Sequence, residues 1–302
     1  MRLTRNDRKN MCGRFAIILP PEAVRAFFQY VEQPNFPPRA NIAPTQPIPI
    51  IRMEREPGGG KSRHFVLVRW GFLPGFVKDP KDFPLVINAR SETAAEKPSF
   101  RNAMKRRRCI IAADAFYEWR RDKDGQDKDG KGKDGKSKAK KPSVPFLIRR
   151  RDGAPMAFAA LWETWAGPNG EEVETACILT TSANGLMAPI HNRMPVILEP
   201  EDFERWLDVD EDNAARAAEL MVPAADSVLE AFQISTDVNK VANDTLEMMK
   251  PVAGGERYPA GDGQEFASPD QTGAENPAAA TPGVKGVSRR RKKNNTMGDL
   301  FG

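Results

Sequence analysis

The apolar residues of this chain are gathered into short runs, each about as long as a β-strand and bounded by turn residues. Runs of this length favour strands, because a helix usually needs about ten residues or more. The runs cover residues 11–19, 64–72, 85–89, 109–119, 145–150, 156–162, 176–183, 194–198 and 229–235. Helical patterns are fewer and cover residues 21–30, 91–107 (with a break at Pro98), 201–207 and 213–221. The sequence therefore predicts an α+β fold, with a curved, mostly antiparallel β-rich core and short flanking helices.

Three segments fall outside this pattern and bound a single domain at residues 11–254. Residues 121–141 repeat Lys, Asp and Gly without apolar side chains, which predicts a disordered insertion between two strands. Residues 255–302, rich in Gly, Pro, Ala and Ser, are predicted to form a disordered basic tail. Residues 1–10 are polar and are interpreted as a leader or, preferably, as a misassigned start upstream of Met11. The proline-rich stretch 34–49 is expected to be irregular.

Charge is divided unevenly along the chain, whose net charge is +5. Residues 11–119 carry 17 basic and 10 acidic side chains, whereas residues 142–254 carry 8 and 19. A nucleic-acid surface is therefore expected mainly in the first half. No apolar run approaches the roughly 20 residues of a membrane span, so we expect a cytoplasmic protein that does not cross a membrane. The three cysteines and two histidines show no zinc-site spacing, and neither a metal nor another cofactor is expected.

Cys12 follows Met11 directly, and removal of the preceding residues would make it the N-terminal residue. An α-amine has a pKa of roughly 7.7–8.0, so part of it is an unprotonated nucleophile at neutral pH. Such an amine can condense with an aldehyde, and the neighbouring thiol can then close a thiazolidine ring. On this motif alone, Cys12 would more commonly be interpreted as a small buried hydrophobic residue.

Two further motifs carry polar groups suited to chemistry. In NARSET, Asn88 can orient a sugar hydroxyl and Arg90 can hold a phosphate, although a capped strand-to-helix turn explains the motif equally well. In FYEW, Glu118 lies between aromatic residues, where burial would raise its pKa. Trp119 offers a stacking face for a base. Strand alternation could instead turn Glu118 toward solvent.

His191 is one of only two histidines and is followed by Arg193 in the motif IHNRMP. Imidazole is the usual general acid or base near neutral pH, and a structural histidine is the alternative. Trp70, beside Gly and Pro turn residues in RWGFLPGF, is either a stacking platform or part of the core.

Taken together and in this order, these motifs resemble those of the SRAP family, the SOS response-associated peptidases or abasic-site processing proteins. The resemblance covers about residues 11–250 apart from the 121–141 insertion, and it weakens the structural alternatives given above. The matching segments are Met11–Phe15, Trp70–Gly75, Asn88–Thr93, Phe116–Trp119 and His191–Pro195.

The resemblance implies a role for each motif residue. The new N-terminal Cys12 would crosslink to an abasic site in single-stranded DNA after self-cleavage of the chain before it. Asn88 would position the amine and the sugar, Glu118 would shuttle protons, and His191 would assist ring opening and strand cleavage. The remaining residues would contact DNA, through phosphates or by stacking: Arg14, Trp70, Arg90, Trp119 and Arg193.

Two alternatives remain open at this stage, namely a cysteine peptidase that acts on other proteins and a non-catalytic binder of single-stranded DNA. We expect a monomer that is associated with the nucleoid. The end of the chain, Met297–Phe301, faintly resembles a sliding-clamp-binding peptide, so a replication clamp is a second expected partner.

Overall fold

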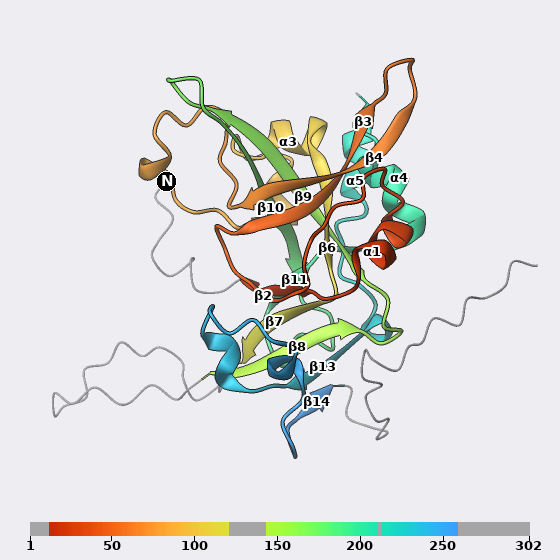
Figure 1. Ribbon diagram of the computed structural model, residues 1–302, viewed down its shortest axis with the longest axis vertical. Coiled ribbons are helices and arrows are strands. Elements are labelled where there is room, and N and C mark those ends of the chain that lie inside the picture. The colour runs from red at the N-terminus through yellow and green to blue at the C-terminus, as the bar shows by residue number, and fades with distance from the viewer. Residues whose placement is uncertain (1–11, 121–142, 211–212, 259–302) are drawn as a thin grey trace, which may run out of the picture. The chain divides into compact units, whose positions relative to one another are not determined.

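The computed structural model describes residues 12–120, 143–210 and 213–258, which form two sheets and a few short helices (Figure 1). The first sheet has six strands in the order β14-β13-β8-β7-β1-β2, and its pairings are antiparallel. Its strands are β1 (Phe15–Ile17), β2 (Arg39–Ile42), β7 (Ala115–Arg120), β8 (Val144–Arg150), β13 (Leu229–Gln233) and β14 (Arg257–Tyr258).

The second sheet has eight strands, in the order β11-β10-β4-β3-β6-β9-β12 with β5 paired beside β10. Its β10 pairs in parallel with β4 and with β5, and the other pairings are antiparallel. Its strands are β3 (Pro47–Arg55), β4 (Lys61–Trp70), β5 (Asn88–Arg90), β6 (Arg108–Ala113), β9 (Met156–Ala166), β10 (Glu172–Ser182), β11 (Arg193–Pro195) and β12 (Ile197–Leu198).

The core has two parts, one on each face of the eight-stranded sheet. Side chains from both sheets, among them Phe116 and Phe158, fill the space between the sheets. The opposite face is covered by helices, which contribute Phe28, Met104 and Trp206. The helices are α1 (Pro21–Phe28), α2 (Ser91–Ala94), α3 (Arg101–Arg106), α4 (Phe203–Leu207) and α5 (Asn213–Ala218). Burial on both faces explains why β6, which is buried along its whole length, is apolar from Cys109 to Ala113 rather than alternating.

The α+β architecture agrees with the sequence prediction, but two local predictions are wrong. Residues 34–49 are not irregular throughout, since β2 and the start of β3 lie in them. The Trp70 N–H donates to the Gln46 carbonyl, so the nitrogens of Pro47 and Pro49 face away from β4. On the other side of β3, strand β6 pairs only with Ile50 and Ile51. The two prolines therefore remove no hydrogen bond between strands. Residues 257–258 form β14, although the tail was predicted to begin at residue 255.

Arg108 is a buried cation that joins two helix ends to the eight-stranded sheet. Its guanidinium donates to the carbonyls of Met104, Trp206 and Asp208, with distances of 2.6 Å and 2.7 Å for the first two. Burial lowers its pKa to about 10. Carbonyls at the end of a helix lack partners within the helix, and this side chain supplies them with donors.

The outer edge of β2 is covered by the segment that follows β13. The Asp244 carboxylate accepts from the backbone N–H groups of Ala40 and Asn41, at 2.5 Å and 2.9 Å. The buried Asn41 side chain donates to three carbonyls of the same segment, including that of Asn243 at 2.7 Å. Two polar side chains thus hold this segment on the edge strand.

The described helices are all short, and none is long and apolar enough to cross a membrane. The predicted insertion at 121–141, the leader at 1–10, the tail beyond residue 258 and the clamp-like peptide Met297–Phe301 lie outside the described residues.

Candidate active site at Cys12

Cys12 lies three residues before β1, between the two sheets. Phe15 of β1 pairs with Phe116 of β7, and the Tyr117 N–H donates to the Arg14 carbonyl at 3.0 Å. This pairing brings the residues before β1 alongside Glu118. Phe116 and Glu118 share one face of β7, and because Phe116 belongs to the core between the sheets, the Glu118 carboxyl group faces that core as well.

Asn88 reaches Cys12 from the other sheet. It is the first residue of β5, which pairs in parallel with β10 through Asn88 and Ile178. The Asn88 side-chain amide donates to the Cys12 carbonyl at 2.9 Å, and both residues are buried. This bond fixes the backbone of Cys12 against β5.

Glu118 is a buried carboxyl group that lies next to His191, another of the predicted catalytic residues. It is only 4% exposed, and burial raises its pKa to about 8. One carboxylate oxygen lies 3.8 Å from Nδ1 of His191. The side chain therefore holds its proton at neutral pH, where an ordinary glutamate has lost it, and this allows it to act as an acid or, after transfer, as a base.

Two buried acceptor atoms beside Cys12 have no hydrogen-bond partner among the described residues, Oδ1 of Asn88 and Oε1 of Glu118. An unsatisfied buried polar atom costs about 1–3 kcal/mol. Their positions next to Cys12 indicate that the site is arranged for a donor that is brought to this residue.

The Cys12 thiol is in an environment that disfavours the thiolate. It is 1% exposed, its sulfur lies 3.8 Å from the Arg14 carbonyl, and burial together with nearby Glu118 raises its pKa well above the ordinary value. A nucleophilic cysteine usually has a lowered pKa next to a cation. At neutral pH the sulfur is therefore a protonated thiol.

His191 is held by the turn that joins β10 to β11. Its backbone N–H donates to the Met187 carbonyl at 2.8 Å, and its Nδ1 accepts from the Arg193 N–H at 3.1 Å. The Arg193 guanidinium makes a two-pronged ion pair with Glu92 of α2, at 2.5 Å and 2.9 Å, and also donates to the Thr180 carbonyl. Sequence reasoning missed Glu92 and Thr180 as partners of Arg193.

The structure places the two remaining arginines of the predicted DNA contacts in different environments. Arg90 ends β5 and is exposed, so its guanidinium can reach a phosphate. Arg14 is directed into the protein, where it donates to Oδ1 of Asn41 at 2.8 Å and to the Val238 carbonyl at 2.9 Å. In this arrangement Arg14 holds the segment that covers β2 rather than an external phosphate.

The interpretation of Trp70 as a stacking platform needs correction, because the side chain is completely buried. Its indole N–H donates to the Ile87 carbonyl at 3.0 Å, and its ring packs edge-on against Phe15. The same motif instead exposes Phe76, which is 63% accessible on the loop leading to Asn88. Trp119 is partly exposed and donates to Oδ1 of Asn239 at 2.7 Å.

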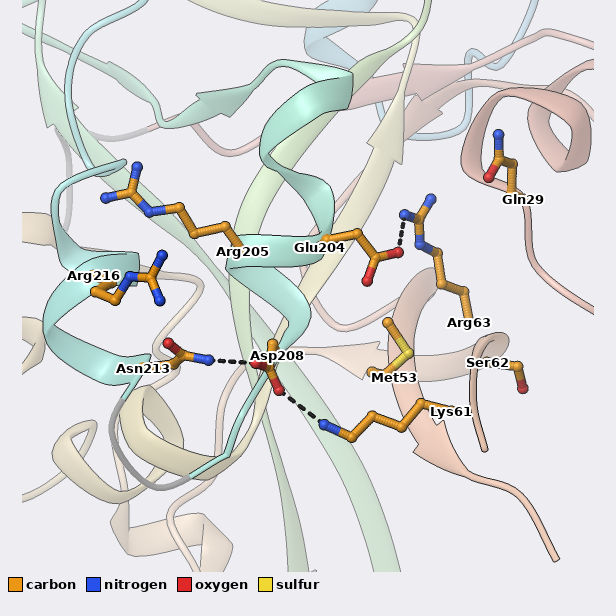
Figure 2. Close-up of a pocket in the computed structure, with 10 residues that line it drawn as sticks. All are labelled: Gln29, Met53, Lys61, Ser62, Arg63, Glu204, Arg205, Asp208, Asn213 and Arg216. Atoms are coloured by element: carbon orange, nitrogen blue, oxygen red, sulfur yellow. Dashed lines mark hydrogen bonds and ion pairs between the residues drawn. The ribbon is translucent and has the colours of Figure 1, made fainter. Parts of the chain in front are cut away.

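A surface hollow of about 570 Å³ lies elsewhere, beside β4, α4 and α5 (Figure 2). Lys61 and Arg63 on its wall already pair with Asp208 at 2.9 Å and Glu204 at 2.6 Å. None of the predicted catalytic residues lines it. Within the described ranges, no three His, Cys, Asp or Glu side chains gather as a metal site would require.

The chain is similar to known proteins over most of its length. The chain is 35% identical over 243 residues to the abasic site processing protein YoqW of Bacillus subtilis, covering 80% of this chain and 99% of that one. It is 31% identical over 255 residues to the abasic site processing protein YedK of Escherichia coli, covering 80% and 100%. A crystal structure from Bacteroides thetaiotaomicron shares the fold, with a TM-score of 0.66, 24% identity, and coverage of 80% and 100%.

The family model described as SOS response associated peptidase (SRAP) matches residues 11–241, a range that contains Cys12, Asn88, Glu118 and His191. Because the match spans most of the chain and the relatives are aligned over nearly their whole length, this protein belongs to the SRAP family.

Proposed function

We propose that this protein processes abasic sites in single-stranded DNA by forming a covalent bond through Cys12. The observation that carries the proposal is the set of groups around this residue: a fixed backbone, a protonated Glu118 whose Oε1 has no partner among the described residues, and the equally unpartnered Oδ1 of Asn88. The names of the relatives, abasic site processing proteins, support the same substrate.

The chemistry starts when the peptide bond before Cys12 is cut, which frees its α-amine. The amine attacks the aldehyde carbon of the opened abasic sugar and forms a carbinolamine. Glu118 then gives its proton to the departing hydroxyl group, so water leaves and a protonated imine forms, and the Glu118 carboxylate takes the N–H proton back to leave the neutral imine. The Cys12 sulfur adds to the imine carbon, its proton goes to the nitrogen, and a thiazolidine ring closes.

The state of the thiol favours this route over a cysteine peptidase that acts on other proteins. A peptidase needs a thiolate paired with a basic histidine. Here Cys12 is a buried thiol with a raised pKa, and His191 lies against Glu118. Ring closure requires only a neutral thiol next to its own amine, and burial keeps it in that form.

The surroundings of the site support single-stranded DNA as the substrate. Arg90 would hold a phosphate beside the lesion, and partly exposed Trp119 would stack on a neighbouring base. Exposed Phe76 on the loop before Asn88 supplies a second aromatic face. Stacking and phosphate contacts tolerate any base sequence. We further propose that His191 assists strand cleavage and reversal of the adduct.

The test is incubation of the purified protein with a single-stranded oligonucleotide that carries one abasic site, followed by denaturing electrophoresis. Intact mass should show a chain that begins at Cys12. Cys12→Ala and Asn88→Ala should lose the stable adduct, whereas Cys177→Ala, which removes a buried thiol on the other face of the sheet, should keep it. Glu118→Gln should slow the reaction and the removal of Met11.

Two outcomes would reject the proposal. One is an adduct that persists undiminished in Cys12→Ala, and the other is an active protein whose Cys12 nitrogen is still acylated. A non-catalytic binder of single strands predicts that Cys12→Ala binds abasic and intact oligonucleotides equally well, with no adduct in the wild type.

A further inference from the structure

The segment that follows the site residues Asn88 and Arg90 is unusually basic for a folded part of the chain. Residues 97–108 (KPSFRNAMKRRR) contain lysines and arginines but no acidic residue. Arg107 and Arg108 serve the fold, because Arg107 pairs with Glu163 at 3.1 Å and Arg108 is buried against backbone carbonyls. The other cations of this segment need a different explanation.

Lys97, Arg101, Lys105 and Arg106 are exposed, and among the described residues they have no side-chain hydrogen bond or ion pair. Many other cations of the described ranges are paired, for example Arg52 with Glu174 at 2.6 Å and Arg120 with Glu256 at 2.5 Å. The four side chains therefore form a positive surface on one short helix and the turn before it, next to the exposed carboxylate of Glu96.

The geometry of the turn aligns three of these cations in a row. The Arg101 N–H donates to the Lys97 carbonyl at 2.9 Å, which closes a turn ahead of α3, although α3 itself begins at Arg101. Within α3, Arg101 and Lys105 lie four residues apart, and Lys97 precedes them by the same spacing in that turn, while Ala103 and Met104 pack into the core. Neighbours at this spacing have Cβ atoms about 5–6 Å apart.

This row is unfavourable for the isolated helix, since like charges four residues apart cost about 0.2–0.5 kcal/mol per pair. Acidic residues at the same positions would remove that cost. The arrangement is instead suited to a ligand that presents regularly spaced negative charges, as the phosphates of a nucleic-acid strand do.

The row can be reached from the proposed active site along the surface. Arg90 ends β5, α2 follows it directly, and Lys97 lies three residues after the end of α2. In Figure 1, α3 lies above β7, the strand that carries Glu118. A strand that binds at both places must therefore extend beyond the nucleotides next to the lesion.

We propose that Lys97, Arg101 and Lys105 bind the phosphates of the single strand on one side of the lesion, which passes from Arg90 over α2 to α3. The proposal rests on the proposed function for the position of the lesion. It adds a second contact region, on the helix-covered face of the eight-stranded sheet, that sets affinity for DNA extending past the site.

The experiment measures equilibrium binding of an abasic analogue that lacks the aldehyde, so that no covalent step interferes. The triple variant Lys97→Gln, Arg101→Gln, Lys105→Gln is compared with the wild type on three single-stranded oligonucleotides. One has only short flanks around the lesion, and the others extend on the 5′ or on the 3′ side. The matched control is Arg151→Gln, Arg216→Gln, Lys240→Gln, which removes the same charge from exposed cations elsewhere.

The triple variant should bind the short oligonucleotide like the wild type and bind one of the two extended oligonucleotides more weakly. Each lost phosphate contact lowers the salt slope by about 0.7, so between 50 and 200 mM salt the wild type should lose roughly 20-fold more affinity than the variant. The control triple variant should keep the wild-type slope. Melting temperatures of all variants verify that they are folded.

Equal weakening on both extended oligonucleotides, or equal weakening by the control variant, would overturn the proposal because it would reflect overall charge. An unchanged salt slope would overturn it as well. The aldehyde-bearing oligonucleotide with short flanks is tested in parallel. If the wild type forms no adduct there while the α3 variant still loses affinity, the function of Cys12 fails and the binding surface stands.

Discussion

The raised pKa of Glu118 predicts a specific dependence of stability on pH. The folded protein releases the Glu118 proton at a pKa of about 8, whereas the ordinary value is 4.5. Between these values the folded state keeps a proton that the unfolded state has lost. The free energy of unfolding must therefore fall as the pH rises through this window, and the loss is complete above pH 8.

The size of the effect follows from the two pKa values. The linkage relation gives a loss of about 3 kcal/mol between pH 5 and pH 8 for this one group. That is a large share of the 5–15 kcal/mol by which a typical domain is stable. Because Glu118 is only 4% exposed, solvent screening reduces the value little.

The assay compares wild type with Glu118→Gln, since glutamine has nearly the same shape but cannot ionise. Denaturant unfolding at several pH values gives the free energy of unfolding of each protein. The difference between the two should shift by about 3 kcal/mol in favour of the variant from pH 5 to pH 8. Glu247→Gln, which removes an exposed carboxylate, is the control for the loss of one negative charge. A difference between Glu118→Gln and wild type that stays constant with pH would refute the raised pKa and with it the role of Glu118 as an acid.

Three further substitutions test the supporting contacts. Arg108→Met should lower the free energy of unfolding by about 3 kcal/mol in denaturant titrations, because it leaves buried carbonyls without donors; a neutral effect would contradict this. Tyr117→Phe should lower it by about 1 kcal/mol through loss of the bond to the Ala40 carbonyl at 2.5 Å, while adduct formation on a gel stays unchanged. Arg14→Gln should lower it by about 1–2 kcal/mol yet leave the salt slope of DNA binding unaltered, whereas a reduced slope would restore Arg14 as a phosphate ligand.

The sequence predicted the elements whose pattern is local. Strand-length apolar runs identified most strands, and the break at Pro98 correctly separated α2 from α3. The sequence prediction failed at β3. A strand can contain Pro47 and Pro49 only because the neighbouring strand β6 begins to pair after them. That information is not contained in the stretch itself.

The candidate site shows the same division. The aromatic neighbours of Glu118 left open whether it is buried or turned toward solvent, and the structure buries it and raises its pKa. Arg14 and Trp70 were assigned to DNA from the family resemblance, but their surroundings depend on residues distant in the chain, Val238 and Ile87. Phe76 escaped notice because the exposure of a loop aromatic is decided by how the loop folds back.

The hydrogen bonds from β2 to Asp244 affect how readily this protein self-associates. A bare edge strand is a template on which another chain can add a strand, and such addition leads to swapped dimers or fibrils. The Asp244 carboxylate already accepts from two consecutive backbone N–H groups of β2. A strand from another chain therefore cannot pair with these groups. Asp244→Ala should therefore promote self-association at high concentration, visible by light scattering, even where unfolding is not detectable.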